Sequence, residues 1–141
     1  MISTFLFYTF LAASLYVTYT DIRYRRIPDK ITLTLFFGLL LYRIAEGSIL
    51  YYLPGLLLTA GLLFAVAYWS NGGIGGGDIK LMAAYAMYFP VIGSVAVLVF
   101  SHIYGILYGL AYLLIKKKHV EIPLAPGFLI GFVLSSPFLL E

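Results

Sequence analysis

The sequence predicts an all-α, polytopic membrane protein built as a bundle of six transmembrane helices. Two observations lead to this class. Of the 141 residues, 62% are hydrophobic and only 11% are charged, whereas a globular domain carries about 25% charged residues. The hydrophobic residues also form long segments without strand-like alternation, and a backbone in lipid satisfies its hydrogen bonds within helices. We expect a single domain over residues 1–141.

Six apolar segments follow one another along the chain, and each is expected to form one helix. Three of them reach the roughly 20 residues that a spanning helix needs. The other three are shorter and need less tilt or a thinner bilayer. The long segments are residues 2–20, 49–70 and 91–115, and the short ones are residues 31–45, 79–90 and 126–140.

The basic residues predict the orientation in the membrane. No Lys or Arg precedes the first segment and Arg23 follows it, which is the reverse of a cleaved signal peptide and favours an outer N-terminus. The loops after the first, third and fifth helices share one side, which the positive-inside rule makes cytoplasmic, with both termini outside. Orientation and headgroup contact thus account for the basic residues, and no nucleic-acid partner is expected. These loops hold eight of the nine basic residues: Arg23, Arg25, Arg26, Lys30, Lys80, Lys116, Lys117 and Lys118.

Two acidic residues are expected at the same depth near the cytoplasmic face. Asp21 ends the first segment and Asp78 begins the fourth. Acids at the membrane boundary are costly and often functional. Two close carboxylates share one proton, so that one can act as a base on water and the other as an acid. Each alone also has a structural interpretation, Asp78 as a helix cap and Asp21 as an ion-pair partner of Arg23.

The residues before Asp78 carry almost no side chains, because residues 72–78 read GGIGGGD. Neither phosphate-binding glycine motif fits, since Lys-Ser/Thr does not follow and the dinucleotide spacing is absent. Glycine lets another backbone come close, so we expect room for an extended peptide beside Asp78. We therefore predict that Gly75, Gly76, Gly77 and Lys80 bind substrate, although contact with headgroups is the simpler role for Lys80.

These motifs resemble those of the type IV prepilin peptidase family of membrane aspartyl proteases, which includes archaeal preflagellin peptidases. The string "GGGD" at residues 75–78 resembles the family's Gly-x-Gly-Asp motif. The string "DIRYRRIPD" resembles its first motif, with Asp21 followed seven residues later by Pro28 and then by Asp29. The string "IPLAPGFLIG" at residues 122–131 is similar to the Pro-rich start of the last family helix, with the usual Pro-Phe-Gly-Pro altered.

The resemblance implies a six-helix peptidase domain in which Asp21 and Asp78 are the catalytic pair and Asp29 is structural. It implies an endopeptidase that removes the short basic leader of a membrane-anchored prepilin-like precursor at the cytoplasmic face. Type IV pilins, Tad pilins and archaeal pilins or flagellins are such precursors, and no metal or organic cofactor is needed. The chain has no cysteine, so the Cys-x-x-Cys methyltransferase domain of many bacterial members is not expected and a peptidase-only form is.

Two other functions remain open from the residues alone. A small membrane transporter or ion-binding protein would use Asp21 and Asp78 as cation ligands and the glycine loop as a helix break, but such a site is expected near the midplane. A catalytically inactive assembly factor would share the same motifs. His102, in the fifth segment, is expected to form a hydrogen bond to a neighbouring helix.

Overall fold

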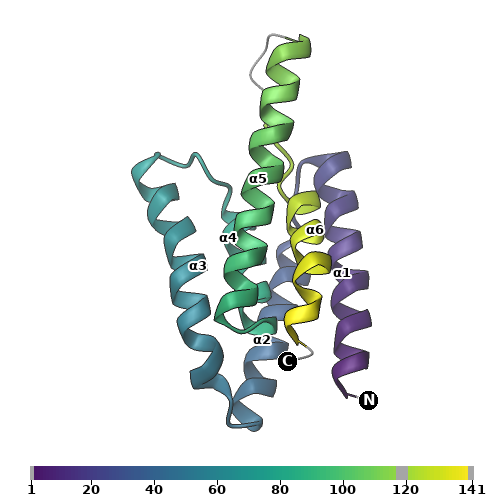
Figure 1. Ribbon diagram of the computed structural model, residues 1–141, viewed down its shortest axis with the longest axis vertical. Coiled ribbons are helices and arrows are strands. Elements are labelled where there is room, and N and C mark those ends of the chain that lie inside the picture. Colours follow the sequence, from purple (N-terminus) through teal and green to yellow (C-terminus); the bar gives the residue numbers. More distant parts are fainter. Residues whose placement is uncertain (1, 117–120, 140–141) are drawn as a thin grey trace.

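The computed structural model describes residues 2–116 and 121–139, and this part of the chain is almost entirely helical (Figure 1). The predicted six helices are confirmed, and the first, third and fifth are long and apolar enough to cross a membrane. The predicted loop positions of Lys117 and Lys118 lie outside the described residues. The helices are α1 (Ile2–Tyr24), α2 (Asp29–Ala45), α3 (Ile49–Trp69), α4 (Gly76–Tyr88), α5 (Val91–Lys116) and α6 (Ala125–Ser135), followed by the 3₁₀ helix η1 (Ser136–Leu139).

α1 and α4 extend furthest beyond their predicted ranges at the end that carries the acids, and α2 also begins two residues early there, at Asp29. α1 continues to Tyr24, so Asp21 lies in its last turn rather than after it. The apolar segment stops there but the backbone hydrogen bonds do not, because the Arg25 N–H still donates to the Asp21 carbonyl at 3.0 Å. α4 begins at Gly76, so Gly76 and Gly77 are helical and not part of a loop.

α4 is the central helix of the bundle although it has only 13 residues. Nearly every side chain from Leu81 to Tyr88 is buried, and the helix packs against α2, α3 and α5. At 1.5 Å per residue α4 is about 20 Å long, short of the roughly 30 Å hydrocarbon core. Other helices surround α4 from Leu81 to Tyr88, whereas its first residue, Gly76, is exposed.

Aromatic side chains from α1, α4 and α6 fill the core between these helices. The Phe132 ring lies 5.5 Å from that of Phe10, and the Tyr85 ring stacks on Phe128 at 5.8 Å. Such offset arrangements are favourable beyond the area they bury. The buried Tyr85 hydroxyl donates to Ser14 Oγ at 2.9 Å, which satisfies both polar groups. This cluster fixes α1 and α6 against α4.

The contact between α5 and α6 requires glycine at two positions. A Cβ on Gly127 would come within 2.9 Å of the Ser101 backbone. A Cβ on Gly131 would come within 3.0 Å of the Val97 backbone. Small residues allow this close approach of helices in membrane proteins, and here they determine where α6 begins relative to α1 and α5.

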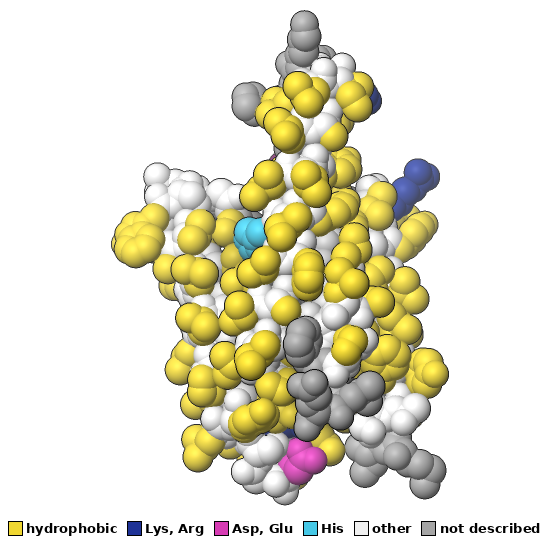
Figure 2. All heavy atoms as spheres, in the orientation of Figure 1, with side chains coloured by type: hydrophobic (Ala, Val, Ile, Leu, Met, Phe, Trp, Pro, Cys, Tyr) yellow, Lys and Arg dark blue, Asp and Glu magenta, His cyan; other side chains and the backbone are white. Residues whose placement is uncertain are grey.

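The outer surface of the bundle is apolar. Figure 2 shows yellow hydrophobic side chains spread over the visible face, with only isolated charged side chains toward its two ends. Large hydrophobic residues on α1, α2, α3 and α5 are more than half exposed, including Tyr8, Leu41, Phe64 and Leu114. This surface fits a body surrounded partly by lipid.

Candidate active site

The fold brings Asp21 and Asp78 to one cavity of about 690 Å³. The cavity lies at the end of the bundle where α1 ends and α4 begins, and the glycine loop before α4, the middle of α5 and residues 121–124 complete its walls. Gly75 also lines the cavity. Two acids that are far apart in the sequence therefore face a common space because α1 and α4 run in opposite directions.

Asp21 is buried and tied to the first residue of α6. Its side chain is 7% exposed, and Oδ2 accepts a hydrogen bond from the Ala125 N–H at 3.0 Å. Ala125 begins α6, so this N–H has no carbonyl partner within its own helix. The carboxylate thus caps α6 from a neighbouring helix and lies at the positive end of the helix dipole.

Asp78 is held differently. It is the third residue of α4, and its backbone N–H donates to the Gly75 carbonyl at 3.1 Å. The capping position is occupied by Gly75, and Asp78 does not cap the helix with its side chain. Among the described residues its carboxylate forms no hydrogen bond or ion pair, and it lies half-buried beside the cavity.

The five glycines of residues 72–77 serve different purposes. Gly72 has a φ of 89°, in the left-handed region, where it ends α3. A Cβ on Gly77 would lie 2.9 Å from Ile27, so this glycine lets the α1–α2 connection approach α4. A Cβ on Gly75 would lie 3.3 Å from Asp78 Oδ2. The glycine at position 75 therefore keeps one side of the carboxylate clear.

Lys80 pairs with Asp29 rather than with Asp78. Its Nζ lies 2.9 Å from Asp29 Oδ1, and the two side chains are 42% and 59% exposed. Asp29 is the first residue of α2, where a negative charge favours the helix dipole. The ion pair joins the two sequence motifs, and it lies outside the residues that line the cavity.

Sequence patterns predicted that residues 23–26 meet headgroups or substrate, but they did not predict that Arg25 joins the segment before α6 at this site. The Arg25 Nη1 donates to the Glu121 carbonyl at 2.8 Å, and the Arg25 backbone has a φ of 53°. This bond connects the end of α1 to residues 121–124, which form one wall of the cavity. The Pro-rich motif at residues 122–131 was the available signal, but it did not indicate which atoms meet.

His102 also lines the cavity, and its expected hydrogen bond to a neighbouring helix is wrong. Its Nδ1 lies 2.8 Å from the Leu98 carbonyl of its own helix and 3.2 Å from Ser101 Oγ. The carbonyl four residues earlier is within reach because these positions share one face of α5. The bond within α5 leaves the other ring nitrogen without a hydrogen-bond partner among the described residues.

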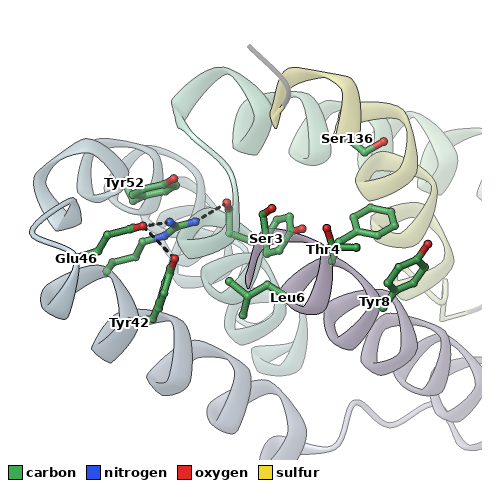
Figure 3. A pocket seen from close by; sticks show the side chains of 11 residues that line it. Ser3, Thr4, Leu6, Tyr8, Tyr42, Glu46, Tyr52 and Ser136 are labelled. Carbon is green, nitrogen blue, oxygen red and sulfur yellow. Dashed lines mark hydrogen bonds and ion pairs between the residues drawn. The ribbon is translucent and has the colours of Figure 1, made fainter. Parts of the chain in front are cut away.

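The opposite end of α4 has a second cavity, of about 500 Å³, where polar groups are paired (Figure 3). Arg43 Nε and Nη2 donate to the carbonyls of Met87 and Tyr88 at 3.2 and 3.3 Å. Arg43 Nη1 lies 3.1 Å from Glu46, and the guanidinium lies 3.8 Å from the centre of the Tyr52 ring. Arg43 therefore caps the C-terminal end of α4.

The Glu46 carboxylate accepts several hydrogen bonds at this second cavity. Ser48 Oγ donates to its Oε2 at 2.9 Å, and the Tyr42 hydroxyl donates to its Oε1 at 3.0 Å. These hydrogen bonds, together with Arg43, hold the pKa of Glu46 below its usual range.

The fold, the apolar surface and the spanning helices define a polytopic helical membrane protein. The chain belongs to the type IV leader peptidase family, whose sequence model matches residues 8–110. The matched region contains both Asp21 and Asp78.

Curated relatives of this chain agree with that family. It is 33% identical over 130 residues to a prepilin leader peptidase/N-methyltransferase of Bacillus subtilis (strain 168), covering 89% of this chain and 52% of that protein. It is 27% identical over 118 residues to a protein of the same name from Aeromonas salmonicida (strain A449), covering 79% of this chain and 40% of that protein. The chain thus spans about half the length, or less, of these relatives. No solved structure matches it significantly.

Proposed function

We propose that this protein is a membrane aspartyl endopeptidase that removes the leader of membrane-anchored prepilin-like precursors, with Asp21 and Asp78 as the catalytic pair. The observation that carries the proposal is the common cavity, which both carboxylates line from different helices. Membership of the type IV leader peptidase family supports the substrate class. A transport site is expected near the midplane, and the position of this cavity at one end of the bundle favours the peptidase.

The contacts of the two acids suggest a division of roles. Asp21 accepts the Ala125 N–H at the start of α6, which stabilises a negative charge. Asp78 has no such donor among the described residues. When two carboxylates share one proton, the proton then resides on Asp78. Asp21 is accordingly the base and Asp78 the acid.

The proposed reaction follows from these roles. Asp21 takes a proton from a water molecule, whose oxygen attacks the carbonyl carbon of the scissile peptide bond. Asp78 donates its proton to the carbonyl oxygen, giving a tetrahedral diol. When the C–N bond breaks, the proton on Asp21 passes to the leaving nitrogen and a diol proton returns to Asp78. General acid–base catalysis of this kind contributes about 10²- to 10⁴-fold to the rate.

Substrate binding and orientation complete the proposal. Gly75 lines the cavity and leaves room for an extended peptide beside Asp78. Gly76 adds no side chain at the start of α4, Gly77 packs against Ile27, and Lys80 contributes a positive charge near the same helix end. The cavity lies at the end that carries the basic loops, so the active site faces the cytoplasm and both termini lie outside.

Co-expression with a pilin-like precursor tests the proposal, with leader removal read as a mass shift of the precursor. Wild type is expected to cleave, Asp21→Asn and Asp78→Asn are expected to be inactive, and the matched control Asp29→Asn is expected to remain active. Cleavage by Asp21→Asn at the wild-type rate would contradict the assignment of the first acid. Absence of cleavage by wild type, together with sodium or calcium binding that either mutation abolishes, would favour the ion-binding function.

A further inference from the structure

His102 is a polar side chain of the cavity that has no part in the mechanism above. The Leu98 carbonyl can only accept a hydrogen bond, so the 2.8 Å contact places the ring hydrogen on Nδ1 of His102. In the neutral ring the second nitrogen, Nε2, then carries no hydrogen and is an acceptor. Because His102 lines the cavity and its Nδ1 is held by the helix backbone, Nε2 is the ring nitrogen left to accept a hydrogen bond there.

The glycine loop before α4 carries backbone donors at the same cavity. The N–H groups of Gly72 and Gly73 are used within the loop, by the Ala67 carbonyl at 2.9 Å and by Ser70 Oγ at 3.0 Å. The N–H groups of Ile74 and Gly75 have no partner among the described residues, and both residues line the cavity. The lining of the cavity therefore includes backbone donors on the glycine loop and a side-chain acceptor on α5.

We propose that His102 is a substrate-binding residue whose Nε2 accepts a main-chain N–H of the substrate next to the scissile bond. This inference rests on the proposed peptidase function. An extended peptide carries N–H and C=O groups on both edges, so it can bond to Ile74 and Gly75 on one side and to His102 on the other. Main-chain hydrogen bonds of this kind hold extended peptides in many recognition sites. Arg25 also lines the cavity but carries only donors, so it cannot accept this N–H, whereas the His102 ring can.

Two substitutions of His102 distinguish the effect of its hydrogen-bond acceptor from the effect of its ring. His102→Gln places an amide oxygen near the position of Nε2, whereas His102→Phe keeps a ring of similar size without an acceptor. We expect His102→Phe to raise KM for a purified precursor about 10-fold, the effect of one lost hydrogen bond, with kcat changed less than about 3-fold. His102→Gln is expected to return KM to within about 3-fold of wild type. Ile103→Phe, a neighbouring exposed position outside the cavity lining, controls for a new ring on α5.

Binding measured without turnover provides a second test. In an Asp78→Asn background the dissociation constant for the uncleaved precursor should follow the same order, with His102→Phe weakest and His102→Gln close to the parent. The inference would be overturned if His102→Phe had the same KM as wild type, or if both His102 variants raised KM equally. Because the wild type would still cleave, the peptidase function would stand in either case. An inactive wild type would overturn the proposed function itself.

Discussion

The polar side chains at the two ends of α4 differ in whether they have hydrogen-bond partners. At the C-terminal end, Arg43 donates to the last carbonyls of the helix and pairs with Glu46, and its side chain is only 11% exposed. At the N-terminal end, Asp78 is half-buried and, among the described residues, its carboxylate has no partner. Both ends border a cavity, so space alone does not distinguish them.

The difference separates polar groups that stabilise the fold from those that are available for chemistry. A polar group taken out of water costs free energy unless a hydrogen bond compensates it. Arg43 meets that condition with protein atoms and gains a contact with the Tyr52 ring. Asp78 does not, and an unpaired acid inside a membrane protein is a strong functional indication. Asp21 is intermediate, because it both lines the cavity and caps α6.

Alanine substitutions of Asp21 and Asp78 should have the largest effects on activity and should distinguish the structural role of one acid from that of the other. Asp21→Ala and Asp78→Ala are each expected to lower precursor cleavage at least about 100-fold, because each removes an acid–base group. Their stabilities should differ. Asp21→Ala loses the cap of α6 and is expected to lower the free energy of unfolding by about 1 kcal/mol, whereas Asp78→Ala should not lower it. Cleavage assays and unfolding in mixed micelles measure both effects; equal destabilisation would show that Asp78 also holds the fold.

Arg43→Met should have the opposite effect to Asp78→Ala, lowering stability but not activity. The substitution leaves the carbonyls of Met87 and Tyr88 without their side-chain donor and removes one of the three donors to the Glu46 carboxylate. We expect the free energy of unfolding to fall by about 2 kcal/mol, with cleavage per folded molecule within about 2-fold of wild type. Arg26→Met removes an exposed charge at the other end of the bundle and serves as the control. A large loss of activity in folded Arg43→Met would mean that the two ends of α4 are coupled.

Substitutions of two glycines in α6 test whether the hydrogen bond from Ala125 to Asp21 is important for catalysis. Gly127→Ala and Gly131→Ala each place a methyl group about 3 Å from the backbone of α5, and each should cost about 1–3 kcal/mol of stability. Gly127 lies two residues from Ala125 and Gly131 lies six, so only Gly127→Ala should also lower kcat, by about 10-fold, through displacement of Asp21.

Gly38→Ala is the control for these substitutions. A Cβ at this position of α2 meets nothing within 4 Å, so the change should raise stability by about 0.5–1 kcal/mol. If Gly131→Ala lowered kcat as much as Gly127→Ala does, the loss would come from general loosening of α6 and not from the cap.

The sequence predicted the features that depend on chain order alone. Alternating helix directions were enough to place Asp21 and Asp78 at the same end, and apolar segments were enough to count the helices. Contacts between distant residues were not predictable in this way. The bond from Ala125 to Asp21 joins positions 104 residues apart, and its donor is a backbone N–H that any residue except proline supplies. The bond from Arg43 to Met87 spans 44 residues and ends on a backbone carbonyl.

Helix ends were mispredicted for a related reason. Hydropathy marks where apolar side chains stop, but a helix ends where its backbone hydrogen bonds stop. α1 therefore continues through the polar residues from Asp21 to Tyr24, and α4 begins within the glycines. His102 shows the same limit, because a polar residue in an apolar segment can bond within its own helix as well as across helices.

The ion pair between Lys80 and Asp29 gives the smallest expected effects. Because both side chains are substantially exposed, Lys80→Met and Asp29→Asn should each change the free energy of unfolding by no more than about 1 kcal/mol. If Lys80 binds substrate as proposed, it must leave Asp29 to do so. Lys80→Met should then raise KM by about 3-fold, while Asp29→Asn should leave KM equal or lower, since it frees the ammonium group. Equal KM values in the two variants would assign Lys80 to the ion pair alone, and would place substrate binding on the glycine loop and α5.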